Sequence, residues 1–330
     1  MKKILALFAI LVIAVIAYAG WQLQQPYKGF DTPVIVELPR GTTTGQMANV
    51  LSREGVIRSP WLFLAARVFR RGANLQAGEY QFSRAASPLE VYSRIVRGDI
   101  YYMELLVPEG FNIFDVANDV AKLGTMPAET FLAAARDPSL IRDLDPQAQT
   151  LEGYLFPNKY RVLRKTTARE ICKMMTDAFR AHWKNLGAAA GASVHDAVTL
   201  ASLVEREARL PQERTLVASV FQNRLRIGMR LDCDPTTVYA ALLDGRYTGV
   251  IHQSDLANEN PYNTYTHAGL PPGPIANPGA GSIQAALTPS TTPFLYFVAK
   301  ADGSGGHTFS ESLEQHEAAV TAYRRATTHH

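Results

Sequence analysis

The chain has 330 residues, of which 47% are hydrophobic and 19% are charged. This composition is ordinary for a globular protein and excludes an intrinsically disordered chain. The formal net charge is only +3, and the lysines and arginines are scattered rather than gathered in a basic run or stripe. A nucleic-acid-binding protein is therefore not expected. The length allows a short anchor and two or three compact units.

The first feature along the chain is an apolar run from Ile4 to Trp21. As a helix rising about 1.5 Å per residue, it would span roughly 27 Å, close to the ~30 Å hydrocarbon core of a bilayer. Lys2 and Lys3 precede it, which predicts a short cytoplasmic N-terminus and an extracytoplasmic remainder. A cleaved signal peptide is the alternative, but its apolar core would be shorter, about 7–15 residues. We therefore expect residues 1–22 to be a single-pass anchor in the cytoplasmic (inner) membrane.

An internal repeat follows this anchor. Residues 23–33 are expected to form a linker, and residues 34–124 to form a region with two copies of a strand–turn–helix pattern. The first copy has a strand at 34–38 and a helix that ends at Gly55, and the second begins with a strand at 103–107. The other elements expected in this region are helices at 60–69, 88–96 and 113–123 and a strand at 76–82. Small units of this kind are typical of binding modules, although an ordinary α/β packing domain gives the same pattern.

Residues 125–330 are expected to form a second, larger domain. Residues 258–293 are rich in Pro, Gly, Asn and Thr, which predicts a long irregular loop of the kind that carries functional sites. A buried strand at 294–299 and residues 307–309 are expected to pair as a β-hairpin. The helices expected here are 129–136, 168–186, 193–210, 216–227 and one that runs from Ser310 to about Arg325. Together with the first region, these patterns predict an α+β fold.

Cysteine and histidine patterns give no sign of a metal site or cofactor. Cys172 and Cys233 lie far apart, outside any ligand motif, and are expected to be buried free thiols, although an oxidising compartment would permit a disulfide. His307 and His316 are not accompanied by a third ligand in the sequence. We therefore expect a protein without metal or cofactor.

The expected helix at 193–210 carries the strongest chemical signal. It is apolar almost all round, so it should lie in a core, and it ends with Glu205 and Glu207. At about 100° per residue these two side chains point roughly 200° apart, so one cleft should receive only one of them. A carboxyl held against apolar neighbours has a raised pKa and can protonate a glycosidic oxygen. The alternative is an ordinary ion pair with a nearby arginine, for which the sequence offers Arg206, Arg209 and Arg214.

Several motifs are similar to those of one known family. They are Leu200-Ala201-Ser202-Leu203-Val204-Glu205-Arg206-Glu207, Val217 to Leu225, Leu151 to Pro157, Gly228 to Leu231 with Asp234-Pro235-Thr236, Tyr262-Asn263-Thr264-Tyr265, Gly269 to Ile275 and Gly306 to Phe309. In this order they resemble the YceG-like family over nearly the whole chain. Two positions depart from the family pattern, since Asn158-Lys159 stands where Asp-Thr is common and Cys233 where a small polar residue is common.

The resemblance implies an activity and a site. It implies an endolytic peptidoglycan transglycosylase in which Glu205, the first glutamate of the Val-Glu-x-Glu motif, is the catalytic residue. It also implies a LysM-like wall-binding region at 34–124 and a lysozyme-like catalytic domain at 125–330. The expected reaction cuts nascent strands between N-acetylmuramic acid and N-acetylglucosamine and leaves a 1,6-anhydro end. The partners implied are nascent glycan strands, the membrane and peptidoglycan synthases.

Other polar residues are candidates for substrate binding. Glu152, in a Gly-aromatic-Pro context, is expected to shape the sugar groove or to position Glu205, with a helix cap or ion pair as the alternative. Gln222 and Asn223 carry amides that suit N-acetyl groups, although Asn223 can equally brace local backbone. Tyr262, Asn263, Thr264 and Tyr265 suit sugar stacking and hydrogen bonding, with loop structure as the alternative. Asp234, before Pro235, is more typical of a turn than of a catalyst.

The number of catalytic acids separates the remaining hypotheses. Hydrolytic glycosidases usually need two carboxylates, and the sequence pairs no second acid with Glu205. A transglycosylase can use one, because the sugar's own 6-hydroxyl replaces water. A hydrolytic muramidase and a non-catalytic wall-binding scaffold are the alternatives, and reducing ends or uncut glycan would distinguish them.

Overall fold

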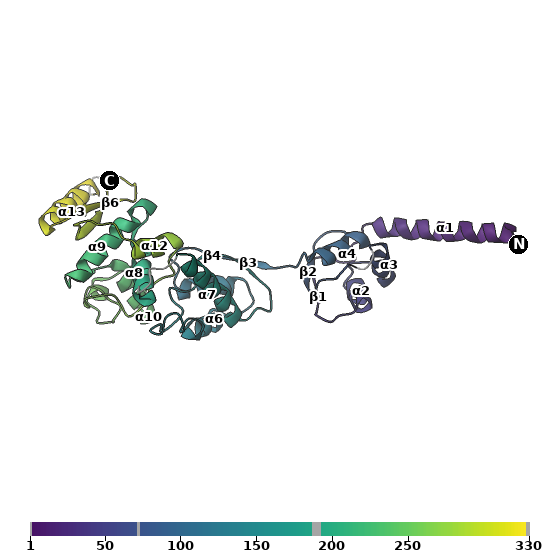
Figure 1. The fold of residues 1–330 in the computed structure, drawn as a ribbon, viewed down its shortest axis with the longest axis horizontal. Coiled ribbons are helices and arrows are strands. Elements are labelled where there is room, and N and C mark those ends of the chain that lie inside the picture. Colours follow the sequence, from purple (N-terminus) through teal and green to yellow (C-terminus); the bar gives the residue numbers. More distant parts are fainter. Residues whose placement is uncertain (1, 71–72, 187–192, 328–330) are drawn as a thin grey trace. The chain divides into compact units, whose positions relative to one another are not determined.

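The structure is a computed structural model that describes residues 2–70, 73–186 and 193–327 (Figure 1). The chain divides into two compact units, Met1–Met103 and Glu104–His330. This division falls earlier than the boundary expected at residue 124. The reason is that β3 (Met103–Val107), the strand of the second repeat copy, pairs with β4 (Asn158–Val162) of the second unit. Both units mix helices and strands, in agreement with the expected α+β class.

The first unit begins with the apolar helix α1 (Lys2–Gln24). Within the described residues it is the one helix that is long and apolar enough to cross a membrane. Leu23, near its end, is buried in the core of the unit, and Tyr27 pairs with Ala86 a few residues later. The segment expected to be a linker is therefore held against the unit directly after the helix ends.

The rest of the first unit is a two-stranded antiparallel sheet covered by three helices. Strand β1 (Val34–Leu38) pairs with β2 (Gly78–Phe82) in the register Val36↔Tyr80. Val36 and Leu38 are buried and the intervening Glu37 is exposed, which is the period-two pattern of a half-buried strand. The helices are α2 (Thr44–Arg53), α3 (Pro60–Phe69) and α4 (Pro88–Arg97). Each begins where the sequence supplies a start signal, either a Thr or Ser cap or a proline in the first turn.

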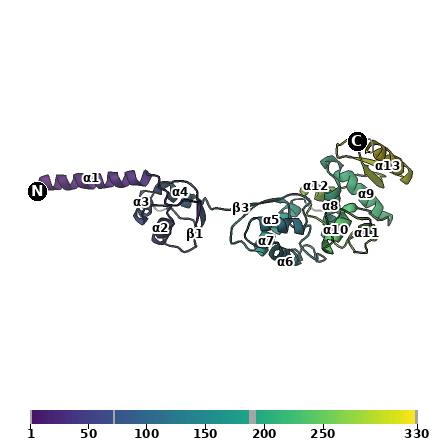
Figure 2. The same cartoon turned by 180° about the vertical axis from the view of Figure 1, so that it is seen from behind.

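The second unit is mainly helical and is organised around α8 (Val194–Glu207). Every residue of α8 from Ala197 to Val204 is buried, so the expectation of a core helix is confirmed. It packs against α9 (Arg214–Arg226), α10 (Asp234–Leu243) and α12 (Ala280–Leu287), which surround it in Figure 2. The other elements are α5 (Ile113–Lys122), α6 (Ala128–Ala135), α7 (Ala168–Asn185), α11 (Gln253–Leu256), β5 (Tyr296–Ala299), β6 (His307–Ser310) and α13 (Leu313–Thr327).

The expected C-terminal hairpin is present. Strands β5 and β6 pair antiparallel, with Phe297 opposite Phe309. The expectation that the first strand is buried is wrong, because its residues are half-buried to exposed. A two-stranded sheet leaves much of each strand uncovered, even though α13 and α9 contact β5.

Both cysteines are free and buried, as expected. The Cys172 thiol lies in the core, where burial raises its pKa to about 12. The Cys233 thiol donates a hydrogen bond to Glu207 at 3.2 Å.

Candidate active site

The Glu205 carboxyl lies at the C-terminal end of α8, where it meets the start of α12. Its Oε2 atom accepts a hydrogen bond of 2.9 Å from the backbone N–H of Gly279, the N-cap of α12. Its Oε1 atom lies 3.5 Å from Nη2 of Arg214, at the start of α9. The surroundings are thus more polar than the apolar ones expected, and both contacts suit a carboxylate. The guanidinium contact is long for a hydrogen bond.

A second carboxylate shares this arginine. Nη2 of Arg214 lies 3.1 Å from Oε2 of Glu109, which follows β3 in the Pro-Glu-Gly turn. Because one nitrogen atom contacts both carboxyls, the two contacting oxygens lie no more than about 7 Å apart. The exposed fraction of the side chain is 46% for Glu109, 17% for Arg214 and 7% for Glu205. Glu109 is therefore the solvent-facing member of the three.

Glycines let these charged groups approach the start of α12. A Cβ atom on Gly279 would lie 2.0 Å from a Glu109 oxygen, and one on Gly281 would lie 2.3 Å from Nη1 of Arg214. Such separations are far below van der Waals contact, so any side chain at either position would displace Glu109 or Arg214. From the sequence, the glycines of this segment were expected only to mark a loop. In the structure, Gly279 and Gly281 allow close packing around the Glu205 carboxyl and its partners.

Glu152 is fully buried and holds the backbone around the site. It is 2% exposed, so its carboxyl lies inside the fold rather than on the surface. Its two oxygens accept hydrogen bonds from the backbone N–H of Ile113 at 2.9 Å and from Nδ2 of Asn277 at 3.1 Å. Burial raises the pKa of Glu152 to about 8, although the bond from Ile113 opposes the rise. The helix-cap role is thus present, since Ile113 is the first residue of α5.

Asn277 connects Glu152 to the segment that carries Gly279. Its backbone exchanges hydrogen bonds with the Glu109 turn, since Gly110 N–H donates to Asn277 O at 3.0 Å and Asn277 N–H donates to Phe111 O at 2.8 Å. Its side-chain oxygen accepts from the N–H of Leu155 at 2.9 Å. These bonds fix the turn before α5 beside the start of α12, and Gly279 follows two residues later. Sequence reasoning did not find Asn277.

Glu207 has a different environment, as the helical spacing predicts. Its carboxyl accepts from the thiol of Cys233 and is away from the Arg214 cluster. Burial raises its pKa, opposed in part by the Cys233 bond. Arg206, between the two glutamates, donates to the backbone oxygen of Gly110 at 3.1 Å. Of the two glutamates, Glu205 is the one whose carboxyl contacts Arg214, which also pairs with the exposed Glu109.

The two amides on α9 are placed differently. Gln222 is exposed and lines a cavity of about 300 Å³ with Asp196 and Leu200 of α8. Glu205 does not line this cavity. Asn223 is buried and donates to the backbone oxygens of Thr292 and Phe294 at 2.8 and 2.9 Å. Its contacts are those of a backbone brace, the alternative given above.

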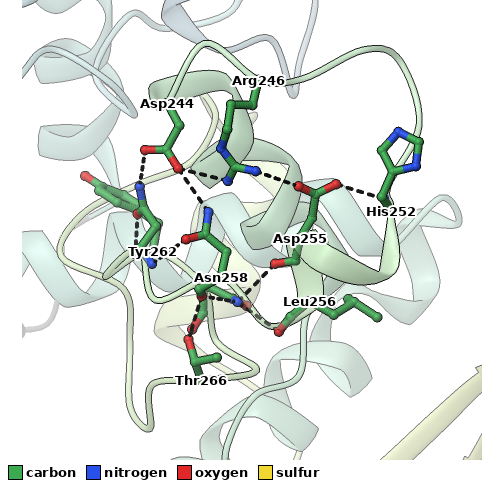
Figure 3. Close-up of polar contacts among 10 residues, drawn as sticks. Asp244, Arg246, His252, Asp255, Leu256, Asn258, Tyr262 and Thr266 are labelled. Carbon is green, nitrogen blue, oxygen red and sulfur yellow. Dashed lines mark hydrogen bonds and ion pairs between the residues drawn. The ribbon is translucent and has the colours of Figure 1, made fainter.

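The Tyr262–Tyr265 motif belongs to a loop held by its own polar bonds (Figure 3). Asn263 is fully buried, and its Nδ2 donates to backbone oxygens of Leu256 and Asn258 at 3.1 and 2.7 Å. Thr264 is equally buried, and its hydroxyl accepts from the N–H of Cys233. These two side chains therefore have partners inside the fold.

The two tyrosines of the motif are half-buried. Tyr262 packs against Tyr239 with ring centroids 5.1 Å apart, and burial raises its pKa to about 12. The hydroxyl of Tyr265 donates to Asp234 at 2.6 Å, at the start of α10. Asp234 thus accepts a bond from the loop, and both rings retain some exposed surface.

Comparison with known proteins identifies the family of this chain. A model described as the YceG-like family matches residues 36–322. The chain belongs to the YceG-like family. An endolytic murein transglycosylase of Bacillus subtilis is 33% identical over 324 residues, which cover 92% of this chain and 89% of that protein. One from Streptococcus pneumoniae is 27% identical over 88% of this chain, and the chain spans 58% of that longer protein.

A solved structure of the same family supports the fold. The crystal structure of a YceG-like protein from Listeria monocytogenes is 31% identical and has a TM-score of 0.58. The match covers 88% of this chain and 99% of that chain. This chain therefore shares its fold with a solved YceG-like protein.

The histidines considered as metal ligands have other contacts in this YceG-like chain. His307 binds Glu213 through Nδ1 at 2.8 Å. The ring of His316 stacks on Tyr296, with centroids 5.2 Å apart. Burial lowers the pKa of His316, helped by the nearby Arg224.

Proposed function

We propose that this chain is an endolytic murein transglycosylase that cuts glycan strands between N-acetylmuramic acid and N-acetylglucosamine, with Glu205 as acid and base. Membership of the YceG-like family and the names of its relatives support the reaction class. The observation that carries the residue assignment is the position of the Glu205 carboxyl. It ends a buried helix, and a backbone N–H and a guanidinium meet its two oxygens beside an exposed carboxylate.

The proposed reaction needs one acid that works twice. Protonated Glu205 gives its proton to the oxygen that links C1 of N-acetylmuramic acid to the next sugar, and the C1–O bond breaks. The 6-hydroxyl of the same muramic acid attacks C1, and its proton passes to the Glu205 carboxylate. The product is a 1,6-anhydro end, no water is consumed, and Glu205 is again protonated. The N-acetyl group of the muramic acid is proposed to steady the positive charge at C1.

Arg214 is proposed to assist Glu205 electrostatically, because its guanidinium lies beside the carboxyl that gives and recovers the proton. Arg214 contacts Glu109 more closely than Glu205, at 3.1 against 3.5 Å, and its buried Nε has no partner among the described residues. A shift toward Glu109 when glycan binds would release the acid for the first step. A return would stabilise the carboxylate after proton donation.

The two units are proposed to divide binding and catalysis. The first unit, with the strand–turn–helix pattern of residues 34–55, is proposed to be LysM-like and to bind the wall. The second is proposed to be the lysozyme-like catalytic domain. Lys2 and Lys3 support a cytoplasmic N-terminus and an extracytoplasmic remainder. Nascent peptidoglycan is the proposed substrate, and peptidoglycan synthases are proposed partners on the basis of the family resemblance alone.

The test is product analysis by mass spectrometry on polymerised lipid II. Wild-type protein should yield anhydro-ended fragments, and Glu205→Gln should lower the rate by about 10²–10⁴-fold. Glu207→Gln is the matched control, because it changes the other carboxyl of the helix end and its amide oxygen can still accept from Cys233. Full activity of Glu205→Gln, or loss only in Glu207→Gln, would contradict the assignment. Glycan that is bound but left uncut by wild-type protein would favour a non-catalytic scaffold.

A hydrolytic muramidase is the second candidate, because Glu109 supplies the second carboxylate that the sequence did not reveal. In that mechanism Glu109 would activate water or attack C1. Glu109→Gln would then abolish cleavage, and wild-type products would carry reducing ends. Under the proposed mechanism Glu109→Gln lowers the rate but keeps the anhydro product, since Glu109 acts only through Arg214.

A further inference from the structure

Helix α3 of the first unit presents an apolar face to solvent. Trp61, Leu64, Ala65 and Val68 lie on one face of the helix, at spacings of three, four and seven residues. Trp61 is 76% exposed and Val68 is 77% exposed, while Leu64 and Ala65 are half-buried. These four residues are called the α3 apolar face. The opposite side of the helix buries Phe63 and Ala66 in the core.

Helix α3 is apolar on both sides, but only one side is covered by the rest of the unit. Single exposed apolar residues are normal in a soluble protein, but a contiguous patch with a large aromatic residue is typical of an interaction site. Leu64 and Ala65 also pack against the core of the unit, whereas Trp61 and Val68 stay uncovered. Something outside the unit is therefore expected to cover this outer part of the face.

The position of α3 indicates what that is. Helix α1 contacts α3 and α4, and Leu23 near the end of α1 is buried in the same core. In both views α3 lies at the end of the first unit from which α1 extends (Figures 1 and 2). If α1 crosses a bilayer, its attachment to the core keeps this end of the unit at the membrane surface.

The charges around the α3 apolar face fit a lipid surface. Residues 56–70 contain three arginines and no acidic residue, and Arg58, Arg67 and Arg70 are all exposed. Basic side chains beside an apolar helix face are typical of helices that lie in the membrane interface, where anionic headgroups attract them. Tryptophan is also the residue enriched at the headgroup level.

We propose that the α3 apolar face lies in the membrane interface, with Trp61 and Val68 among the headgroups and upper acyl chains and the three arginines against anionic phosphates. The first unit is then fixed to the bilayer at two places, the anchor and α3, which restricts its orientation. This proposal rests on α1 crossing the membrane and does not depend on the proposed reaction.

The experiment uses the full chain in vesicles of phosphatidylethanolamine and phosphatidylglycerol, with and without bromine atoms near the headgroup end of the acyl chains. The sequence contains three tryptophans, at positions 21, 61 and 183. Bromine should lower the emission of Trp21→Phe protein, and the loss should vanish in Trp21→Phe/Trp61→Phe, in which buried Trp183 remains. Both substituted side chains are exposed, so neither change disturbs the core.

The matched control moves the tryptophan off the α3 apolar face. Arg97→Trp in the Trp21→Phe/Trp61→Phe background puts an exposed tryptophan in the last turn of α4, shortly before the unit ends. Its emission should not respond to bromine. Equal losses with and without Trp61, or no loss at all, would overturn the proposal. A blue-shifted Trp61 emission that ignores bromine but depends on the protein-to-lipid ratio would assign the face to a second copy of the chain instead.

Discussion

The Glu205 end of α8 and the loop around Asn263 both carry sequence motifs, but their polar side chains are used in opposite ways. In the loop, Asn263 donates its amide hydrogens to backbone oxygens and its Oδ1 accepts from the N–H of Tyr265 at 3.0 Å. At Glu205, one oxygen has a single backbone donor and the other has only a long contact to Arg214. The loop side chain has its amide nitrogen and its oxygen both bonded to backbone, whereas the helix-end carboxyl can exchange a partner.

This difference separates motif residues that build the fold from those that are available for chemistry. Asn223 and Thr264 resemble Asn263, because each is buried and bonded to backbone. Glu152 lies between the two groups, since it is buried and fully bonded but supports the segment that leads to Gly279. Substitutions at Glu152, Arg214, Asn263 and Asp244 test this separation.

The largest expected effect is the pH dependence that Glu152 gives to stability. Its pKa is raised from 4.5 to about 8 in the folded protein, so the folded state binds more protons than the unfolded state between these values. The free energy of unfolding should therefore fall as pH rises through this window, by on the order of 5 kcal/mol in total. Glu152→Gln should remove that slope, as measured by thermal melts from pH 5 to about pH 8.5.

The control for this slope is Glu129→Gln, which removes an exposed carboxyl of α6 and should leave it unchanged. If Glu152→Gln keeps the wild-type slope, Glu152 is ionised throughout the window. Its role would then be that of a charged cap for α5 rather than a neutral brace.

Arg214→Gln should lower the rate of glycan cleavage by about 10²-fold, because the guanidinium no longer stabilises the carboxylate of Glu205 after proton donation. Arg214→Lys should restore part of the rate, since it returns the charge without the planar geometry. The melting temperature should change little, because Arg214 contacts half-exposed Glu109 and the site rather than the core. Arg209→Gln, at an exposed position, is the control and should keep wild-type activity. A large fall in melting temperature with an unchanged rate per folded molecule would make Arg214 structural.

Asn263→Ala should have the opposite effect to Arg214→Gln, because it should lower stability and leave the cleavage rate unchanged. It removes the Asn263 amide from the backbone oxygens of Leu256 and Asn258, of which, among the described residues, only Asn258 O keeps another donor, the Thr266 hydroxyl. This loss should lower the free energy of unfolding by about 1–3 kcal/mol. Cleavage per folded molecule should stay near wild type. The measurements are denaturant unfolding and cleavage assays on the same preparation, with Asn49→Ala, at an exposed position of α2, as control. Lost cleavage with unchanged stability would instead place Asn263 in contact with substrate and remove the contrast with Glu205.

Much of the fold could be predicted because local patterns match the final packing. The strands at 34–38 and 103–107 and the helix at 60–69 have the bounds expected from alternation and start signals. Strand β4 and helix α10 were not predicted. Strand β4 is short and charged, and its partner β3 lies some 50 residues earlier, so its pairing leaves no local signal.

Helix α12 shows a different limit of sequence reasoning. It was placed inside an irregular loop at 258–293, because its surroundings are rich in glycine and proline. Five of its eight residues are Ala, Gly or Ser, and Ser282, Ile283 and Ala285 are buried. Tertiary packing against α8 stabilises this helix more than intrinsic propensity does.

The candidate site was only half predictable for a related reason. The end of the apolar helix, a local feature, indicated Glu205 and Glu207 alike, and the family resemblance singled out Glu205. Glu109 and Asn277 reach it from 96 and 72 positions away, and the sequence shows them as a turn residue and a loop residue. No periodicity connects such positions, so the second carboxylate and the brace became visible only when the chain was folded.

The smallest expected effect tests the polar loop at its exposed edge. Asp244 accepts hydrogen bonds from the side chains of Asn258 and Asn260, each at 3.0 Å, and pairs with Arg246 (Figure 3). The Asn258 bond and Arg246 lower the pKa of Asp244, so its contribution is complete above the unfolded value near 4 and is lost as pH falls through the folded value.

Because the Asp244 side chain is about one-third exposed, solvent screens the pair, and Asp244→Asn should cost about 1 kcal/mol or less at neutral pH. The difference in melting temperature from wild type should shrink as pH falls below about 4. Asp31→Asn, at an exposed carboxyl of the first unit, should shift the melting temperature less at every pH. If Asp244→Asn instead abolishes cleavage at unchanged stability, the outer edge of the loop contacts substrate. Only the buried amides of the loop would then serve the fold alone.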